Sequence, residues 1–214
     1  PRADEVLYFL GSAYQEVKDT NKAVKQFIRL TQQYSGSRYT ADAYVNIGEY
    51  YFDNNNAYKA LQAYKQATRF QDSPQYGFAL YKLAWCYFNV QEYDAAIDHM
   101  KQVISYSQDS GDGTAKKVTL QEEALKDLVR FFADAGKTNE AIEYFTKLGK
   151  PELINSMLKR LASAYFEQGK FEQCITTYRR LIKMNQNSPD LPSFQNEIIQ
   201  AYRKIGRKQE TTNE

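Results

Sequence analysis

The side chains able to do nucleophilic or metal chemistry are few and lie far apart along the chain. The sequence holds one histidine, His99, and two cysteines, Cys86 and Cys174, each inside a helical pattern. A catalytic dyad or a zinc site needs several such groups within contact distance of one another. We expect both cysteines to be small buried core residues, and His99 to be a surface or partly packed helix residue.

The carboxylates are numerous but scattered. The 26 Asp and Glu residues follow helical patterns, as on the solvated faces of a soluble helical protein. Asp109, Asp112 and Gly113 resemble a calcium loop only in composition, because neither the carboxylate spacing nor a closing Glu matches. Phosphate-binding and dinucleotide-binding fingerprints are absent from the sequence. The sequence therefore predicts a protein that is not an enzyme and holds no cofactor.

Composition narrows the class of partner. Hydrophobic residues make up 43% of the 214 residues and the formal net charge is only +2, which predicts neither nucleic-acid binding nor membrane binding. No apolar run approaches the roughly 18 residues of a membrane span. Residues 1–4 lead directly into a helical pattern, and we expect the chain to be part of a longer protein. The 18 Tyr and 12 Phe residues recur at helical spacing, which makes repeats the next question.

Two apolar signatures alternate along the chain. The first has large apolar residues at its first, fourth and last places and a small residue usually fifth, which is one face of an α-helix. It recurs at residues 7–14, 44–51, 80–87, 125–132 and 158–165. The second follows after a polar turn, at residues 23–27, 60–64, 96–100, 141–145 and 174–178. The small residues of the two signatures are twelve positions apart in every copy, beginning with Gly11 and Ala23. Five copies at constant spacing predict a helical repeat.

This pattern resembles the tetratricopeptide repeat, a 34-residue helix–turn–helix unit. The resemblance implies an all-α fold: a right-handed superhelical solenoid of about five helical hairpins plus a C-terminal extra helix, as a single domain over residues 1–214. The repeats are expected near residues 4–37, 41–74, 77–104, 122–150 and 155–188. Val129 stands where the family carries Gly or Ala, so the fourth hairpin is expected to be less tightly packed.

Two segments depart from the repeat. Residues 105–119 are polar and rich in Gly and Asp, and we expect a flexible surface excursion there, with a partner contact as the alternative. A last helical pattern at residues 193–206 has two interpretations. It either caps the solenoid, covering its last face, or belongs to a further repeat.

The resemblance implies that the first helix of each hairpin lines a concave groove for a protein or peptide partner. Phe78, Tyr81, Trp85 and Phe88 fall on one stripe of the third such helix, while the opposite stripe already supplies the core. Exposed aromatic patches mark binding sites. The alternative is that neighbouring helices, or the residues of the insertion, bury these rings. The predicted partner-binding residues are Tyr8, Phe52, Phe78, Tyr81, Trp85, Phe88, Lys126, Arg130 and Phe166, with Lys126 and Arg130 as cations for acidic groups of the partner.

The junction at residues 34–43 indicates a biological setting. It resembles the Tyr-Pro-x-Ser-x-Tyr-x-x-x-Ala junction of bacterial envelope tetratricopeptide proteins, such as BamD and the accessory protein of the Tol-Pal system, with Ser35 in place of Pro. The resemblance implies a non-catalytic protein-binding scaffold in the periplasm or cell envelope. From the balanced charge and the absence of a long apolar run we expect neither nucleic-acid binding nor membrane insertion. A cytosolic assembly adaptor and a self-assembling structural protein are the alternatives.

Overall fold

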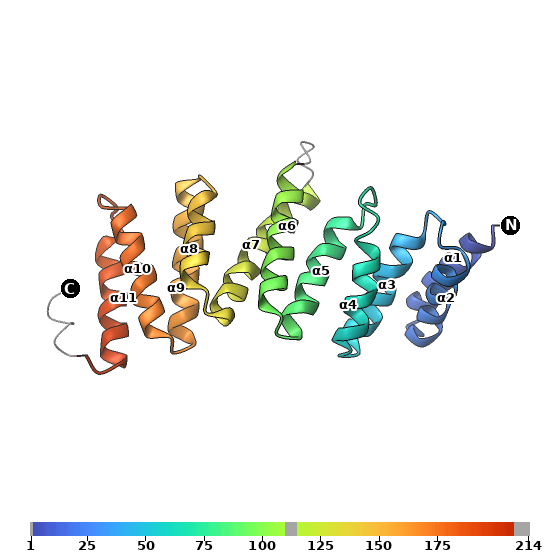
Figure 1. Ribbon diagram of the computed structural model, residues 1–214, viewed down its shortest axis with the longest axis horizontal. Coiled ribbons are helices and arrows are strands. Elements are labelled where there is room, and N and C mark those ends of the chain that lie inside the picture. Colours follow the sequence, from blue (N-terminus) through green and yellow to red (C-terminus); the bar gives the residue numbers. More distant parts are fainter. Residues whose placement is uncertain (1, 110–114, 208–214) are drawn as a thin grey trace. The chain divides into compact units, whose positions relative to one another are not determined.

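Helices joined by short turns make up the fold. The computed structural model describes residues 2–109 and 115–207, and no strand occurs in that part of the chain (Figure 1). The helices are α1 (Ala3–Glu16), α2 (Thr20–Gln33), α3 (Thr40–Asp53), α4 (Ala57–Ala67), α5 (Tyr76–Asn89), α6 (Tyr93–Asp109), α7 (Ala115–Ala135), α8 (Thr138–Lys147), α9 (Pro151–Glu167), α10 (Phe171–Met184) and α11 (Leu191–Lys204). The predicted all-α class is confirmed.

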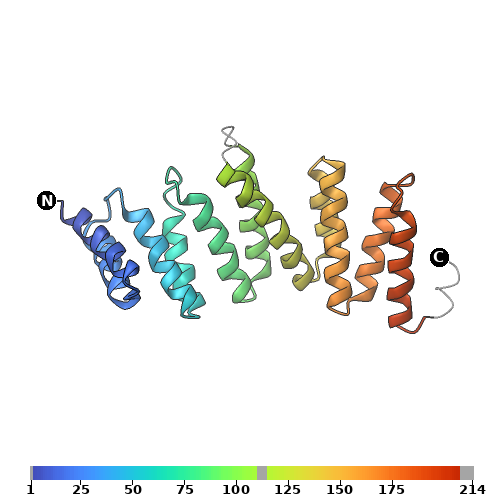
Figure 2. The same cartoon turned by 180° about the vertical axis from the view of Figure 1, so that it is seen from behind.

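The chain divides into two compact units, Pro1–Ala124 and Leu125–Glu214, which are described separately. In the first unit, α1 packs on α2, α3 on α4 and α5 on α6, and α2 and α4 also pack on the hairpin that follows them. In the second unit, α9 packs on α10 and α10 on α11. Figure 2 shows the same succession of helices from behind. We call α1, α3, α5, α7, α9 and α11 the A helices, and α2, α4, α6, α8 and α10 the B helices.

A small residue on each of the first two A helices lets an aromatic ring of its B helix come close. A Cβ atom added to Gly11 would lie 2.7 Å from the ring of Phe27, and one added to Gly48 would lie 2.7 Å from the ring of Tyr64. Both rings are buried, at 1% and 0% exposure. Such distances are shorter than real Cβ contacts, so these two hairpins require glycine.

Side-chain caps mark where two of the B helices begin. The carboxylate of Asp19 accepts a hydrogen bond from the backbone N–H of Lys22 (3.1 Å), three residues into the first turn of α2. The amide oxygen of Asn56 accepts one from the backbone N–H of Lys59 (3.2 Å) at the start of α4. Each cap satisfies a backbone donor that the first helical turn leaves unpaired.

The A helices all end in the same turn. Each carries an aromatic residue near its C-terminal end that we call the closing aromatic: Tyr14, Tyr51, Tyr87, Phe132, Tyr165 and Tyr202. The residue four positions later has a positive φ, in the left-handed region: Lys18 (60°), Asn55 (56°), Gln91 (63°), Gly136 (68°), Gly169 (71°) and Gly206 (75°). The N–H of the following residue donates to the carbonyl of the closing aromatic at 2.8–3.1 Å in every case. Only Gly adopts this conformation without steric cost, so Lys18 and Gln91 are held there by the closed turn.

The predicted surface excursion at residues 105–119 is wrong over most of its length. Residues 105–109 continue α6, and α7 begins at Ala115. Tyr106 explains why α6 extends: its ring packs edge-on against Tyr76 (5.1 Å between centroids) and lies over Gly77. Residues 110–114, with Asp112 and Gly113, lie outside the described residues.

The last helix described in the second unit is α11. α11 packs on α10, with the rings of Tyr178 and Phe194 5.9 Å apart. Its role as a cap or as the start of another repeat stays a prediction.

Within residues 2–109 and 115–207, no helix combines the length and the apolarity that a bilayer span requires.

The shared turn generates a stability prediction for Gln91. Replacing Gln91 with Gly relieves the left-handed strain, and we expect the free energy of unfolding to rise by about 0.5–1 kcal/mol despite the added entropy of the unfolded chain. The measurement is urea unfolding followed by circular dichroism. The matched control is Gly136→Ala, which introduces the same strain and should lower stability by about 1 kcal/mol. A Gln91→Gly variant less stable than the parent would contradict this account of the turn.

Candidate partner-binding surfaces

The third A helix carries a surface of half-buried aromatic rings. Phe78, Tyr81 and Trp85, which we call the α5 aromatic face, are each partly exposed. Phe88 is not part of this surface, because it is only 9% exposed and its ring packs edge-on against Trp85 (5.4 Å) and Tyr93 (5.6 Å). The expectation of an open Phe88 ring is corrected: the start of α6, where Tyr93 lies, covers it.

Lys82 links the aromatic face to the preceding A helix. Its ammonium group lies 5.0 Å from the ring centroid of Phe52 on α3 and 5.3 Å from that of Phe78. It also forms an ion pair with Glu49 at 3.7 Å. Sequence reasoning missed Lys82, although its spacing of four from Phe78 was a usable signal for a cation–π contact on one helix. Phe52 and Phe78 are therefore bridged by a cation.

The other predicted aromatic residues lie in local contacts. Tyr8 stacks on Tyr39, with centroids 4.4 Å apart and ring planes 14° apart, and the hydroxyl of Tyr39 donates to the Glu5 carboxylate at 3.2 Å. Burial, followed by the nearby charge of Asp42, raises the pKa of Tyr8. Phe166 packs edge-on against Phe171 of α10 at 5.3 Å. Tyr8 belongs to the first unit and Phe166 to the second.

The second unit contains a hollow between two A helices that is lined by cations. Lys126 and Arg130 of α7 share it with Lys159 and Arg160 of α9, and its volume is about 550 Å³. We call it the basic groove. Its remaining lining residues are Val129, Ser163, Ala164, Glu167 and Gln168. The structure thus places the two predicted cations together with two more that were not predicted.

Two of the groove cations form ion pairs, and their side chains remain well exposed to solvent. Arg130 forms an ion pair with Asp134 at 3.8 Å, and its side chain is 61% exposed. Lys159 forms one with Asp190 at 2.8 Å, and its side chain is 43% exposed. Exposed ion pairs of this kind contribute at most about 1 kcal/mol and exchange readily. An incoming anion can therefore compete with Asp134 and Asp190 for these two cations.

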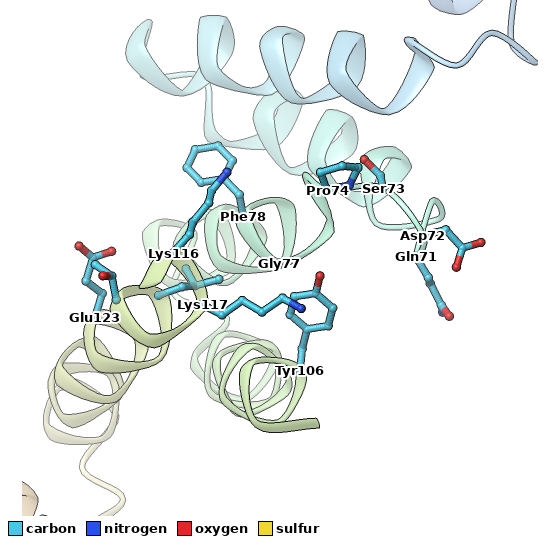
Figure 3. A pocket seen from close by; sticks show the side chains of 12 residues that line it. Gln71, Asp72, Ser73, Pro74, Gly77, Phe78, Tyr106, Lys116, Lys117 and Glu123 are labelled. Atoms are coloured by element: carbon cyan, nitrogen blue, oxygen red, sulfur yellow. The ribbon is translucent and has the colours of Figure 1, made fainter. Parts of the chain in front are cut away.

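A second hollow, of about 640 Å³, lies in the first unit at the start of α5. We call it the α5–α7 pocket. The turn before α5, α5 itself, α6 and α7 supply its walls, and Figure 3 shows Phe78, Tyr106, Lys116 and Lys117 around it. Sequence reasoning missed this pocket because two of its walls come from helical residues that were expected to form a loop. Gly77 lies in the first turn of α5, and a glycine inside a helix was the signal in the sequence that another side chain packs closely against it.

The groups with nucleophilic or metal-binding chemistry are buried or engaged. Burial raises the pKa of the Cys86 and Cys174 thiols to about 12. His99 shares a hydrogen bond of 2.8 Å between its Nδ1 and the carbonyl oxygen of Ala95, and its ring lies 5.0 Å from that of Tyr87. In the described part of the chain, no three His, Cys, Asp or Glu side chains are grouped so that they could hold a metal ion.

The succession of helical hairpins defines an α-solenoid, and comparisons with known proteins identify the repeat. Residues 41–73, 78–110 and 160–188 match family profiles described as "Tetratricopeptide repeat". The chain therefore contains tetratricopeptide repeats. Among curated proteins, none matches this sequence.

Solved structures agree with this assignment at the level of the fold. A tetratricopeptide repeat protein from Parabacteroides merdae superposes with a TM-score of 0.60 at 12% identity, over 100% of this chain and 77% of that chain. A putative kinesin light chain with nearly identical TPR-like repeats, from Podosopora anserina, gives a TM-score of 0.51 at 15% identity, over 98% and 90% of the two chains. At such identities the likeness concerns the fold alone.

The buried thiols generate a reactivity prediction. With a pKa of about 12, each thiol in the native state is almost entirely protonated at pH 8, and the reactive thiolate is scarce. We expect a disulfide reagent such as Ellman's reagent to label neither Cys86 nor Cys174 at pH 8 until urea unfolds the chain, after which both react. Fast labelling of either residue in the native protein would show that its hairpin opens.

Proposed function

We propose that this chain is a non-catalytic scaffold that binds an acidic segment of a protein partner in the basic groove. Tetratricopeptide repeats, which this chain contains, generally mediate protein–protein interaction. The observation that carries the proposal is the meeting of Lys126, Arg130, Lys159 and Arg160 in one hollow whose lining includes a single carboxylate, that of Glu167.

The arrangement of the cations suits an extended acidic chain. Two of them come from α7 and two from α9, so a segment crossing both helices meets positive charge from either side. Arginine forms bidentate hydrogen bonds with carboxylates, whereas lysine acts as a compact point charge. Such complementarity contributes mainly to the association rate and to the choice of partner.

The α5 aromatic face is a second proposed contact, in the first unit. Phe78, Tyr81 and Trp85 are half-buried, so a partner gains apolar contact on rings that are already held in place. Lys82, which is only 22% exposed, fixes Phe78 from the side. We propose that apolar side chains of an extended or helical segment pack on this face.

The setting we propose is a complex of the bacterial envelope. Its support is the junction at residues 34–43, with a cytosolic assembly adaptor as the alternative. Fractionation of the source cells with an antibody against this chain distinguishes the two settings.

The basic groove generates a binding prediction. The probe is a fluorescein-labelled peptide of alternating Asp and Glu, measured by fluorescence anisotropy at low and moderate salt. Replacing Lys126 and Arg160 with Ala removes two groove charges, and we expect affinity to fall about tenfold, together with a weaker salt dependence. An uncharged Asn and Gln peptide of equal length should not bind.

The matched control removes two exposed cations from elsewhere. Lys25 and Lys65 are exposed residues of α2 and α4, and the Lys25→Ala/Lys65→Ala variant changes the net charge by the same amount. It should bind the acidic peptide as the parent does. An equal loss in both variants would mean that net charge alone attracts the peptide, and no loss in the groove variant would exclude the groove.

A second candidate function, self-association, is favoured by the outer face of α1. Val6, Phe9 and Leu10 lie on one side of this helix and are 53%, 54% and 40% exposed, and Val17, which follows the helix, is 72% exposed. The positions that correspond to Val6 and Leu10 in the other A helices are buried. Those that correspond to Val6 are Ala43, Ala79, Ala124, Met157 and Phe194. Those that correspond to Leu10 are Ile47, Leu83, Leu128, Leu161 and Ile198.

Phe9 distinguishes this face from an ordinary repeat junction. The other A helices carry Asn46, Lys82, Asp127, Arg160 and Glu197 at its place. The Phe9 ring packs edge-on against Tyr39 (5.8 Å between centroids) and is still 54% exposed, so much of it is available to a further contact. We propose that a second copy of the chain packs its own α1 against this face.

Sedimentation velocity over a rising concentration series tests this candidate. The parent chain is expected to form a dimer, and the Val6→Lys/Phe9→Lys variant to remain a monomer, because charges on both helices would be buried in the contact. Tyr58→Lys, which replaces a 71% exposed aromatic on α4, is the control and should still dimerise. A parent chain that stays monomeric throughout the series would exclude this candidate.

A further inference from the structure

We infer that the α5–α7 pocket is a binding site for a small amphipathic acid, with an aromatic or aliphatic body and one carboxylate. The pocket belongs to the first unit and the basic groove to the second. The inference does not depend on the proposed scaffold function, and each can fail without the other.

The walls of the pocket are apolar and fixed by packing. The rings of Phe78 and Tyr106 face it, together with Pro74 and Leu120. Tyr106 lies where it does because Gly77 has no side chain: a Cβ atom there would be 2.7 Å from the Tyr106 ring and 3.0 Å from Leu120. The edge-on contact of Tyr106 with Tyr76 holds the ring from the other side. A ligand therefore meets a largely formed surface, as in most small-molecule sites.

The size of the pocket and the number of elements that line it favour a small molecule. Its volume of about 640 Å³ lies within the usual range of small-molecule sites, about 300–1,000 Å³. The turn at residues 71–75, α5, α6 and α7 all contribute to it, so a ligand is contacted from several directions. A groove for a peptide would instead run along a row of parallel helices.

Two lysines supply the charge that selects an anion. In Figure 3 the side chains of Lys116 and Lys117 extend toward the rings of Phe78 and Tyr106, whereas Asp72 and Glu123, which also line the pocket, do not extend toward these rings. The ammonium group of Lys117 lies 5.4 Å from the ring centroid of Tyr106. Beside apolar walls the attraction between an ammonium group and a carboxylate is less screened than in bulk water. An acid should therefore bind better than a neutral molecule of the same shape.

The test uses three probes that share a phenylpropyl body and carry an anionic, a neutral or a cationic end group. They are 3-phenylpropionate, 3-phenylpropan-1-ol and 3-phenylpropylamine, titrated to millimolar concentration into the ¹⁵N-labelled chain and followed by heteronuclear NMR. We expect the acid to shift backbone signals around Gly77, Phe78 and Leu120. The alcohol should bind about tenfold more weakly, as expected for the loss of two partly exposed charge contacts, and the amine should not bind.

Variants assign the effect to the pocket. Lys116→Ala/Lys117→Ala should reduce the affinity for the acid to that for the alcohol, and Phe78→Ala should weaken both probes. Lys126→Ala/Arg160→Ala, which alters the basic groove, should leave the acid binding unchanged. Because Lys116 is exposed and Lys117 half-buried, the lysine variant is expected to keep its helicity, which circular dichroism checks.

Four outcomes would overturn the inference. They are no shift with any probe, equal binding of acid and alcohol to the parent chain, acid binding that survives in the lysine variant, and, in the Lys126→Ala/Arg160→Ala variant, shifts around Gly77, Phe78 and Leu120 that show tighter binding of an acidic peptide with one Phe than of 3-phenylpropionate. The last would assign the pocket to a protein partner. The first three would leave the scaffold function intact, because the acidic-peptide experiment on the basic groove is separate.

Discussion

The close contact between the two helices of a hairpin is the constraint on which the rest of the structure depends. In the first two hairpins the contact is a ring of the B helix pressed against a glycine of the A helix, at a distance that no Cβ atom allows. Burying these rings removes a large apolar surface from water, and the glycine decides how near the two axes can come. Once that distance is set, the next A helix has a defined B-helix surface to pack on. This is why Gly or Ala stands at this place in four of the five copies, with Val129 as the exception.

The turn that closes each hairpin imposes a second constraint with the same origin. A tight A helix and B helix leave little chain between them, so one residue must turn the backbone through the left-handed region. The three turns at Gly136, Gly169 and Gly206 use glycine, and those at Lys18 and Gln91 do not. The geometry of the turn is nevertheless the same, with one backbone hydrogen bond back to the carbonyl of the closing aromatic in each. Hairpin packing therefore overrides the local preference of Lys18 and Gln91, since tertiary contacts outweigh a conformational cost of about 1 kcal/mol.

Predictability from the sequence follows these constraints. The hairpins could be predicted because a constant spacing of twelve residues between these positions reflects a turn of constant length between the two helices. The extension of α6 and α7 could not, because Gly and Asp at residues 109–113 indicate a turn without giving its length. What extends the helices is the contact of Tyr106 with Gly77, two residues far apart in the sequence. The burial of Phe88 could not be predicted for a related reason. A helical stripe shows on which side of a helix a ring lies, but it does not show that Tyr93 covers this ring.

Side chains that take no part in the contact between the two helices of a hairpin can differ from repeat to repeat. The place five residues before the closing aromatic of each A helix illustrates this, because it carries Phe9, Asn46, Lys82, Asp127, Arg160 and Glu197 in turn. No common packing requirement acts there, so apolar, amide, cationic and anionic side chains all occur. Lys82 at this place braces the aromatic face, Arg160 adds charge to the basic groove, and Phe9 makes the face of α1 apolar. A shared scaffold thus fixes where such a side chain stands, and its identity in each repeat determines what that part of the surface can bind.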